Sequence, residues 1–133
     1  MDWEKLPKII KEVALDFEWD NEKVWQLKAE VEKISLSELE WQLDIPFWDT
    51  SKERYVLTPN EVMNNAEKYS EQYKRIMGAD LNYPIDIMKN RKGLWECLDG
   101  LHRVAKAKVL GMNEVEVRKI SQDQIPLILK EKD

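Results

Sequence analysis

The sequence DGLHR at residues 99–103 places a carboxylate, a glycine, an imidazole and a guanidinium within one short stretch. A strand-like run precedes this stretch and a helix-like pattern follows it, so unpaired backbone N–H groups and the positive end of a helix dipole meet there. Anions bind at such helix starts. Gly100 lets a phosphate approach the backbone, His102 adds a titratable donor and Arg103 adds a forked, permanently charged one. We therefore predict a phosphate-binding turn formed by Gly100, Leu101, His102 and Arg103.

Asp99 argues against simple anion capture. A carboxylate beside a phosphate repels it unless a metal ion, or a hydroxyl or ammonium group of a substrate, lies between them. Asp99 could hold Mg²⁺ through water, act as a base on a substrate hydroxyl, or cap the helix N-terminus. The spacing alone favours capping, and either of the other two roles would make Asp99 a catalytic residue.

Length and composition limit the class of protein. A chain of 133 residues usually folds around one hydrophobic core, and 43% hydrophobic residues supply enough apolar material for it. The net charge of −5 gives no general attraction to the phosphate backbone of nucleic acid. No apolar run is long enough to span a membrane, and the N-terminus MDWEKLPKII is unlike a secretory signal. We therefore expect neither nucleic acid nor a membrane as a partner.

The chain has one cysteine, Cys97, which cannot form an internal disulfide. A lone cysteine fits a reducing compartment, and we expect the protein to be cytoplasmic. We expect the Cys97 thiol to be buried and unreactive, because no cation besides His102 is predicted close enough to lower its pKa.

The residues between 58 and 78 predict a helix. Thr58, Pro59 and Glu61 form the reciprocal capping pattern of a helix start, and an apolar stripe then runs to a stop at Gly78. Ser70 is a point at which this helix could break into two pieces.

The residues after the helix predict strands around one further helix. Ile85 and Ile87 flank Asp86 in strand alternation, and the NRKG turn leads to a second apolar run, so a β-hairpin is expected. A short helix from 101 to 110, a strand in NEVEVRKI and another strand at Val31–Leu36 complete the pattern. We predict an α/β (α+β) fold with a small mixed sheet and flanking helices.

The N-terminal part is expected to be helical. Pro7 suits a first helical turn, Val24 and Leu27 suggest a second helix, and the face of the first helix is made by Ile9, Ile10, Val13 and Phe17. We therefore divide the chain into a helical N-terminal extension, residues 1–30, and a main domain, residues 31–133.

The motif LDGLHRVAKAKVLG, followed by VEVRKI and preceded one hairpin strand earlier by YPIDIM, resembles the ParB/sulfiredoxin-like domains. In these α/β domains a phosphate-binding turn reads Gly-x-His/Arg-Arg at a helix start. The resemblance covers roughly residues 31–128, where VEKISLSELEW looks like the family's first strand and ISQDQIPLI like its closing segment. More closely, the chain is similar to small free-standing bacterial proteins with the motif LDGLHRxAKA.

Two branches of the resemblance are excluded by single positions. Leu101 stands where sulfiredoxins carry their reactive cysteine, so the reductase chemistry lacks its nucleophile. His102 stands where ParB partition proteins carry the first arginine of Gly-Glu-Arg-Arg, and the chain is acidic. We therefore expect neither sulfiredoxin activity nor chromosome partitioning with specific CTP recognition.

The motif is also similar to the Asp-Gly-x-His-Arg turn of the free serine kinase branch, which binds nucleotide phosphates. There, an acidic residue near the first strand activates the serine hydroxyl. Glu38, Glu40 and Asp44 in SELEWQLD are the candidates for this acid, and we name Glu40 beside Asp99 as a catalytic candidate.

Two functions remain open. The first is a small-molecule phosphotransferase that uses ATP or ADP with Mg²⁺, with no covalent nucleophile on the protein. The second is a non-catalytic module that binds a nucleotide or another phosphorylated small molecule and reports it to a protein partner. Asp99 favours the first, and the absence of one clear base favours the second. Trp41, Trp48 and Trp95 could stack on a nucleobase, although core packing or a dimer contact is the favoured role for each.

Overall fold

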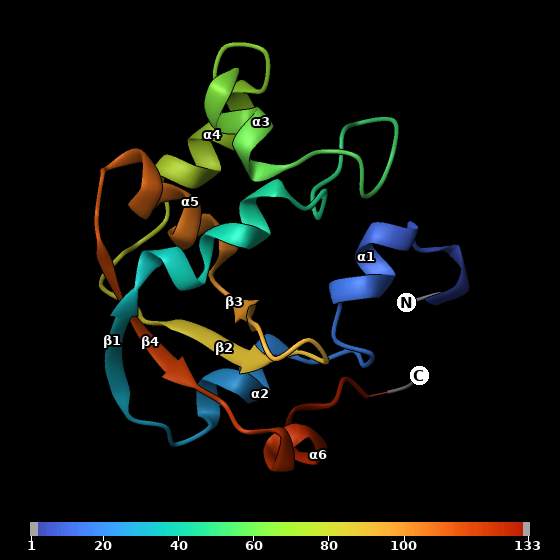
Figure 1. The fold of residues 1–133 in the computed structure, drawn as a ribbon, viewed down its shortest axis with the longest axis vertical. Coiled ribbons are helices and arrows are strands. Elements are labelled where there is room, and N and C mark those ends of the chain that lie inside the picture. Colours follow the sequence, from blue (N-terminus) through green and yellow to red (C-terminus); the bar gives the residue numbers. More distant parts are fainter. Residues whose placement is uncertain (1–2, 132–133) are drawn as a thin grey trace.

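The computed structural model describes residues 3–131, in which a four-stranded sheet lies between two groups of helices (Figure 1). The strands are β1 (Val31–Ser35), β2 (Ile85–Lys89), β3 (Trp95–Asp99) and β4 (Glu114–Lys119). The α-helices are α1 (Lys8–Val13), α2 (Asn21–Gln26), α3 (Pro59–Asn64), α4 (Ser70–Met77), α5 (Leu101–Val109) and α6 (Ile125–Ile128). Short 3₁₀ helices are η1 (Trp3–Lys5), η2 (Leu36–Glu38), η3 (Glu40–Asp44) and η4 (Gln122–Gln124). Residues 1–2 and 132–133, at the outer ends of the two predicted regions, lie outside the described residues.

The sheet is mixed, as predicted. Its strand order is β1-β4-β2-β3, with antiparallel pairing of β1 to β4 and of β2 to β3 and parallel pairing of β2 to β4. The parallel pair requires a crossover connection, because a tight turn can join only antiparallel neighbours. The chain therefore runs from edge strand β3 through α5 to β4, and the predicted phosphate-binding turn is the first corner of this crossover.

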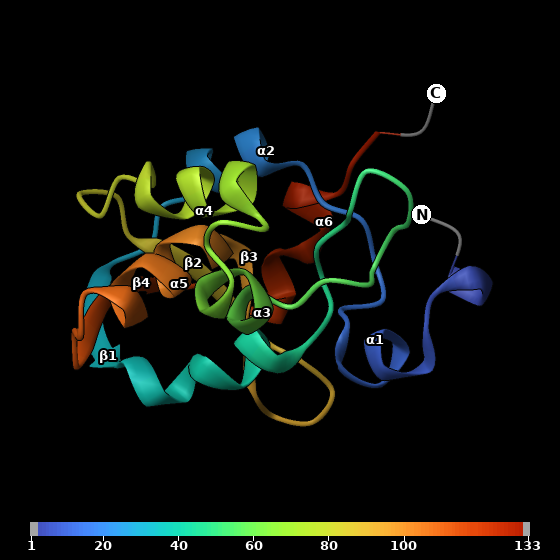
Figure 2. The same cartoon turned by 90° about the horizontal axis from the view of Figure 1, so that it is seen from above.

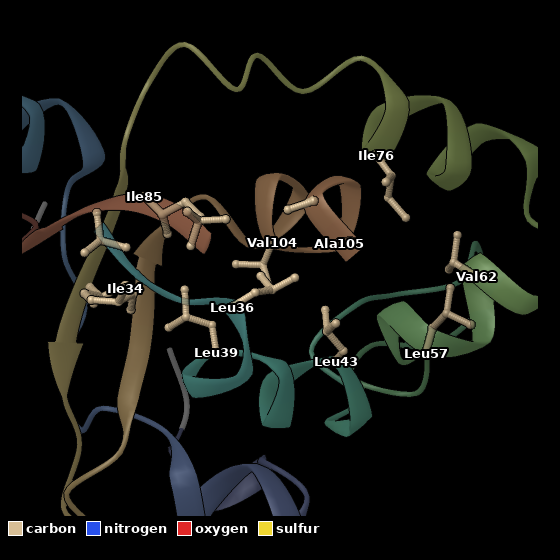
Figure 3. Packing of buried hydrophobic residues seen from close by; sticks show 14 residues of the cluster. Ile34, Leu36, Leu39, Leu43, Leu57, Val62, Ile76, Ile85, Val104 and Ala105 are labelled. Carbon is tan, nitrogen blue, oxygen red and sulfur yellow. The ribbon is translucent and has the colours of Figure 1, made fainter. Parts of the chain in front are cut away.

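The main core lies on the sheet face covered by α3, α4 and α5 (Figure 1). Figure 3 shows how Leu36 of η2, Leu39 between η2 and η3, and Leu43 of η3 point toward Val104 of α5. All four side chains are at most 2% exposed. Since apolar burial is the dominant favourable contribution to folding, this cluster fixes α5 and its first turn against the sheet.

A second, smaller core lies on the opposite face, between the sheet and helices α2 and α6. It is built from Leu15, Val24, Met88, Leu98, Ile120 and Ile128. Val24 is fully buried, so it anchors α2 beneath β2 and β3. This anchor matters for the site, because the next residue of α2 is Trp25.

The predicted helix over residues 58–78 is present in two pieces. The Thr58 side chain accepts from the backbone N–H of Glu61, and the Glu61 side chain accepts from the backbone N–H of Thr58, which confirms the predicted capping box. The helix breaks after Asn64 and resumes at Ser70, the residue at which the sequence indicated a break.

The predicted face of the N-terminal helix is only partly right. Ile10 and Val13 are buried, but Ile9 is 43% exposed and α1 ends at Val13, so Phe17 lies beyond it. Beyond Val13 the chain continues into the second core. Figure 2 shows α1 at one end of the molecule, apart from α3, α4 and α5.

Edge strand β3 is protected by side chains instead of by another strand. The Gln42 amide donates to the Trp95 carbonyl and accepts from the Cys97 backbone N–H, and the Trp41 indole also donates to the Trp95 carbonyl. Such pairing removes the unpaired edge groups that would otherwise invite another strand. The apolar run predicted at Leu94–Leu98 is thus confirmed as a strand, displaced by one residue.

Candidate functional site

The corner between β3 and α5 is formed by Gly100, whose φ of +120° is a conformation that other residues rarely adopt. A Cβ atom here would lie 3.1 Å from the Ile85 side chain and 3.1 Å from Arg103 Nη1. The Gly100 carbonyl accepts from the N–H groups of Arg103 and Val104, so the helix begins at once. The N–H groups of Leu101 and His102 precede the helical hydrogen bonds, so neither is used within the helix.

A cavity of about 560 Å³ opens beside this corner. It is lined by Trp25, Tyr83, Pro84, Asp86, Asp99, Arg103 and Arg118, and we call it the Asp99 cavity. Its volume falls in the range of small-molecule sites, and its walls combine two large aromatic rings with four charged side chains. The residues come from α2, the segment before β2, both strands of the hairpin, α5 and β4, so the cavity exists only in the folded chain.

Arg103 joins the corner to the cavity wall. Its Nη1 donates to the Pro84 carbonyl at 3.1 Å, its guanidinium lies 5.9 Å from the centre of the Tyr83 ring, and its Nη2 lies 3.9 Å from Oδ2 of Asp99. A separation of 3.9 Å is long for a charge-assisted hydrogen bond. Asp99 therefore neutralises Arg103 only loosely.

Asp86 and Arg118 form a tight ion pair at the side of the cavity. Arg118 Nε donates to Asp86 Oδ1 at 2.6 Å, and the other guanidinium nitrogens donate to the carbonyls of Val24 and Leu27. Burial raises the pKa of Asp86 although Arg118 acts in the opposite direction. All three guanidinium nitrogens of Arg118 are thus used to hold α2 and Asp86, and Arg103 is the less tightly paired arginine of the cavity.

The two aspartates of the cavity face each other across the hairpin. Asp86 pairs with Asp99 in the β2–β3 register, next to a bulge between Asp86 and Ile87. Oδ2 of Asp99 also accepts a 2.7 Å hydrogen bond from the indole nitrogen of Trp25. The Asp99 carboxylate is therefore held between an indole and a guanidinium, at the mouth of the crossover corner. The structure gives Gly100 no side-chain cap, so the capping role that the spacing favoured for Asp99 is absent.

His102 is not among the residues that line the Asp99 cavity. Its ring stacks on Trp48, with ring centres 4.6 Å apart and planes 15° apart. Burial and the nearby Arg75 lower the pKa of His102, while Asp99 acts in the opposite direction. Burial and Arg75 thus favour the neutral form of the imidazole over the charged form.

The predicted partner acid is also elsewhere. Glu40 forms an ion pair of 3.7 Å with Lys108, in the last turn of α5, whereas Asp99 precedes the first turn. Glu38, Glu40 and Asp44 do not line the cavity. The reason is packing, because Leu39 and Leu43 of the same segment turn into the main core and direct the acidic side chains outward. The structure thus brings Asp99 and Arg103 together and leaves Glu40 out.

Two other residues of the motif serve the core. Leu101 packs against the main core cluster, so only its backbone faces the corner. Cys97 packs against the same cluster, and burial raises the pKa of its thiol. Neither side chain lines the cavity.

The sequence did not indicate five cavity residues, namely Trp25, Tyr83, Pro84, Asp86 and Arg118. One signal for the charged pair was available. Asp86 interrupts an otherwise apolar strand, and a buried carboxylate needs a partner of opposite charge. The two aromatic residues carried no such signal.

Comparisons with protein-family models, with curated proteins and with solved structures gave no match. The resemblance to ParB/sulfiredoxin-like domains therefore stays a prediction. Within residues 3–131, every helix is too short or too polar to cross a bilayer.

Proposed function

We propose that the Asp99 cavity binds a small phosphorylated ligand, with a nucleotide as the favoured class, in a domain of the ParB/sulfiredoxin type. The observation that carries this proposal is the position of Arg103. Its guanidinium lies in the first turn of α5 and on the cavity wall, and Asp99 pairs with it at 3.9 Å only. A phosphate can therefore take two N–H groups of the guanidinium together with the amides of the Gly100 corner.

The charges of the cavity suit a nucleotide that brings its own Mg²⁺. Within residues 3–131, no group of three or more His, Cys, Asp and Glu side chains could hold a metal ion by itself. Asp86 and Asp99 both line the cavity, and Mg²⁺ is commonly held by one or two carboxylates together with substrate phosphates. With ATP or ADP bound, Asp99 would hold the ion, which would offset the repulsion between this carboxylate and the phosphates.

Binding without catalysis is the form of the proposal that the geometry supports best. Glu40 is paired with Lys108, and His102 is stacked on Trp48. The protein then acts as a sensor of its ligand, with a protein partner reading the bound state.

Phosphoryl transfer is a second candidate, favoured by one observation. The Asp99 carboxylate lies in the cavity beside Arg103, where it could accept the proton of a substrate hydroxyl. Incubation with labelled ATP or ADP and Mg²⁺, with serine and similar hydroxyl compounds as acceptors, tests this function. Transfer by the wild type and its loss in Asp99→Asn would establish it.

Calorimetric titration with ATP, ADP, CTP and inorganic phosphate, with and without Mg²⁺, tests binding itself. Arg103→Ala should weaken nucleotide binding by about 1.5 to 3 kcal/mol, the scale of a lost hydrogen bond to a charged group. The matched control is Arg54→Ala, because Arg54 is an exposed arginine paired with Asp49 away from the cavity. Equal affinity for the wild type and Arg103→Ala would overturn the proposal.

A further inference from the structure

Two large aromatic side chains that line the Asp99 cavity are left open to solvent. Trp25 is 57% exposed and Tyr83 is 63% exposed. They come from segments far apart in the sequence, α2 and the residues before β2. An exposed tryptophan and an exposed tyrosine around one cavity are typical of a recognition surface, since large aromatic rings are usually buried.

The Trp25 ring is held in place although it is exposed. Its indole nitrogen donates to Asp99 at 2.7 Å, and the neighbouring Val24 is fully buried. Arg118 donates to the carbonyls of Val24 and Leu27 at the end of α2, which fixes the helix that carries the indole. The edge of the ring is thus bonded while much of its surface stays free.

The Tyr83 ring is positioned by its neighbours in a similar way. The guanidinium of Arg103 lies 5.9 Å from its centre, and the following residue, Pro84, accepts from Arg103 through its carbonyl. The arginine proposed to bind phosphate is therefore in contact with an aromatic ring. A ligand bound to Arg103 within the cavity would therefore lie close to the Tyr83 ring.

We propose that Trp25 and Tyr83 form a stacking seat for a planar heteroaromatic ring, such as a nucleobase, attached to the phosphate group held at Arg103. This inference rests on the proposed function and names the ligand as a nucleotide instead of a free phosphate or a sugar phosphate. Every base has an aromatic face, so two open rings bind nucleobases with little discrimination among them.

The experiment separates the two halves of the ligand. Calorimetry compares ATP, inorganic tripolyphosphate and adenosine on the wild type, on Trp25→Gln and on Tyr83→Leu. Glutamine keeps an N–H donor for Asp99 while it removes the ring, so the loss of stacking is isolated from the loss of the hydrogen bond. Leu127→Gln is the matched control, because Leu127 is 62% exposed and does not line the cavity.

We expect ATP to bind the wild type about 10-fold or more tightly than tripolyphosphate, the scale of one base on an aromatic ring. Trp25→Gln and Tyr83→Leu should each lose most of this difference and keep the affinity for tripolyphosphate, and Leu127→Gln should resemble the wild type. Circular dichroism and urea midpoints verify that each variant is folded.

The outcomes distinguish this inference from the proposed function. If tripolyphosphate binds and ATP binds no more tightly, the stacking seat is wrong and the phosphate site stands. If tripolyphosphate fails to bind, but adenosine binds the wild type and does not bind Trp25→Gln, the seat stands and the phosphate site is wrong. If none of the three ligands binds the wild type, both are overturned.

Discussion

The indole nitrogen of Trp25 donates a 2.7 Å hydrogen bond to Oδ2 of Asp99, across 74 positions of the chain. This bond ties α2 to the end of β3, at the corner where the crossover to β4 begins. The same oxygen lies 3.9 Å from Nη2 of Arg103. One carboxylate oxygen is therefore shared between a short hydrogen bond to the indole and a longer contact with the guanidinium.

A double-mutant cycle measures this bond. Urea denaturation gives the free energy of unfolding of the wild type, Trp25→Phe, Asp99→Asn and the double variant. The coupling free energy between the two positions should be about 1 kcal/mol, the net value of a single hydrogen bond. If the losses of unfolding free energy in the two single variants add up to the loss in the double variant within a few tenths of a kcal/mol, the two side chains do not interact.

The buried pair of Asp86 and Arg118 predicts a large difference between two adjacent residues. Arg118→Gln leaves the Asp86 carboxylate buried without its cation and should lower the free energy of unfolding by about 3 to 5 kcal/mol. Lys119→Gln is the matched control on the same strand, because Lys119 pairs with Glu32 at the surface. Its loss should be at most about 1 kcal/mol. Similar urea midpoints for the two variants would contradict the role assigned to Arg118.

The site shows which of its parts local sequence can predict. Gly100 and Arg103 belong to one turn, so a glycine at a strand-to-helix corner followed by a forked cation was enough to locate them. The strands around the turn could be predicted as well, because the alternation of apolar and polar residues is also a local pattern of the sequence. Trp25, Tyr83 and Arg118 reach the cavity through the tertiary fold, and no spacing along the chain encodes that meeting.

His102 shows why adjacency in a motif is not proximity in a site. Successive residues of an α-helix point about 100° apart, and in the first turn of α5 Arg103 lines the cavity whereas His102 points to another side of the helix. Trp48 lies on the side to which His102 points, and their stacking uses the imidazole there. Glu40 also lies away from the cavity, because the packing of Leu39 and Leu43 into the main core fixes the orientation of its segment.

The carboxyl group of Glu96 predicts a pH dependence of stability. Glu96 is 4% exposed and accepts from the Asn90 side chain, which also donates to the carbonyl of Val13, the last residue of α1. Burial raises the pKa of Glu96 to about 7 from 4.5, against the opposing effects of Asn90, the Leu15 backbone and Arg91. Between these two values the folded protein holds a proton that the unfolded chain has released.

The contribution of Glu96 to stability is therefore fully present below pH 4.5 and is lost as the pH rises through 7. The free energy of unfolding should fall by about 2 to 3 kcal/mol between pH 5 and pH 8 in the wild type relative to Glu96→Gln, whose amide does not titrate. Urea unfolding of both proteins across this range measures the difference. Parallel pH profiles would show that the carboxyl group titrates normally.

Gly100 and Gly111 allow the corner to be tested with two chemically identical substitutions. Both have positive φ, +120° and +72°, but a Cβ at Gly111 meets open space, whereas one at Gly100 meets Ile85 and Arg103 at 3.1 Å. Gly111→Ala should lose about 1 kcal/mol of unfolding free energy from backbone strain alone. Gly100→Ala should lose about 2 to 4 kcal/mol, since Ile85 is held in the core and strain adds to overpacking.

The same substitution has a consequence at the cavity. Arg103 is the neighbour of Gly100 that can move, so its guanidinium should shift away from the Pro84 carbonyl. Nucleotide affinity should then fall in Gly100→Ala and stay at the wild-type value in Gly111→Ala, as calorimetry at a temperature where both variants are folded can measure. Equal destabilisation by the two alanines would mean that Ile85 and Arg103 move aside without loss of unfolding free energy. The corner would then be less tightly packed than its contacts indicate.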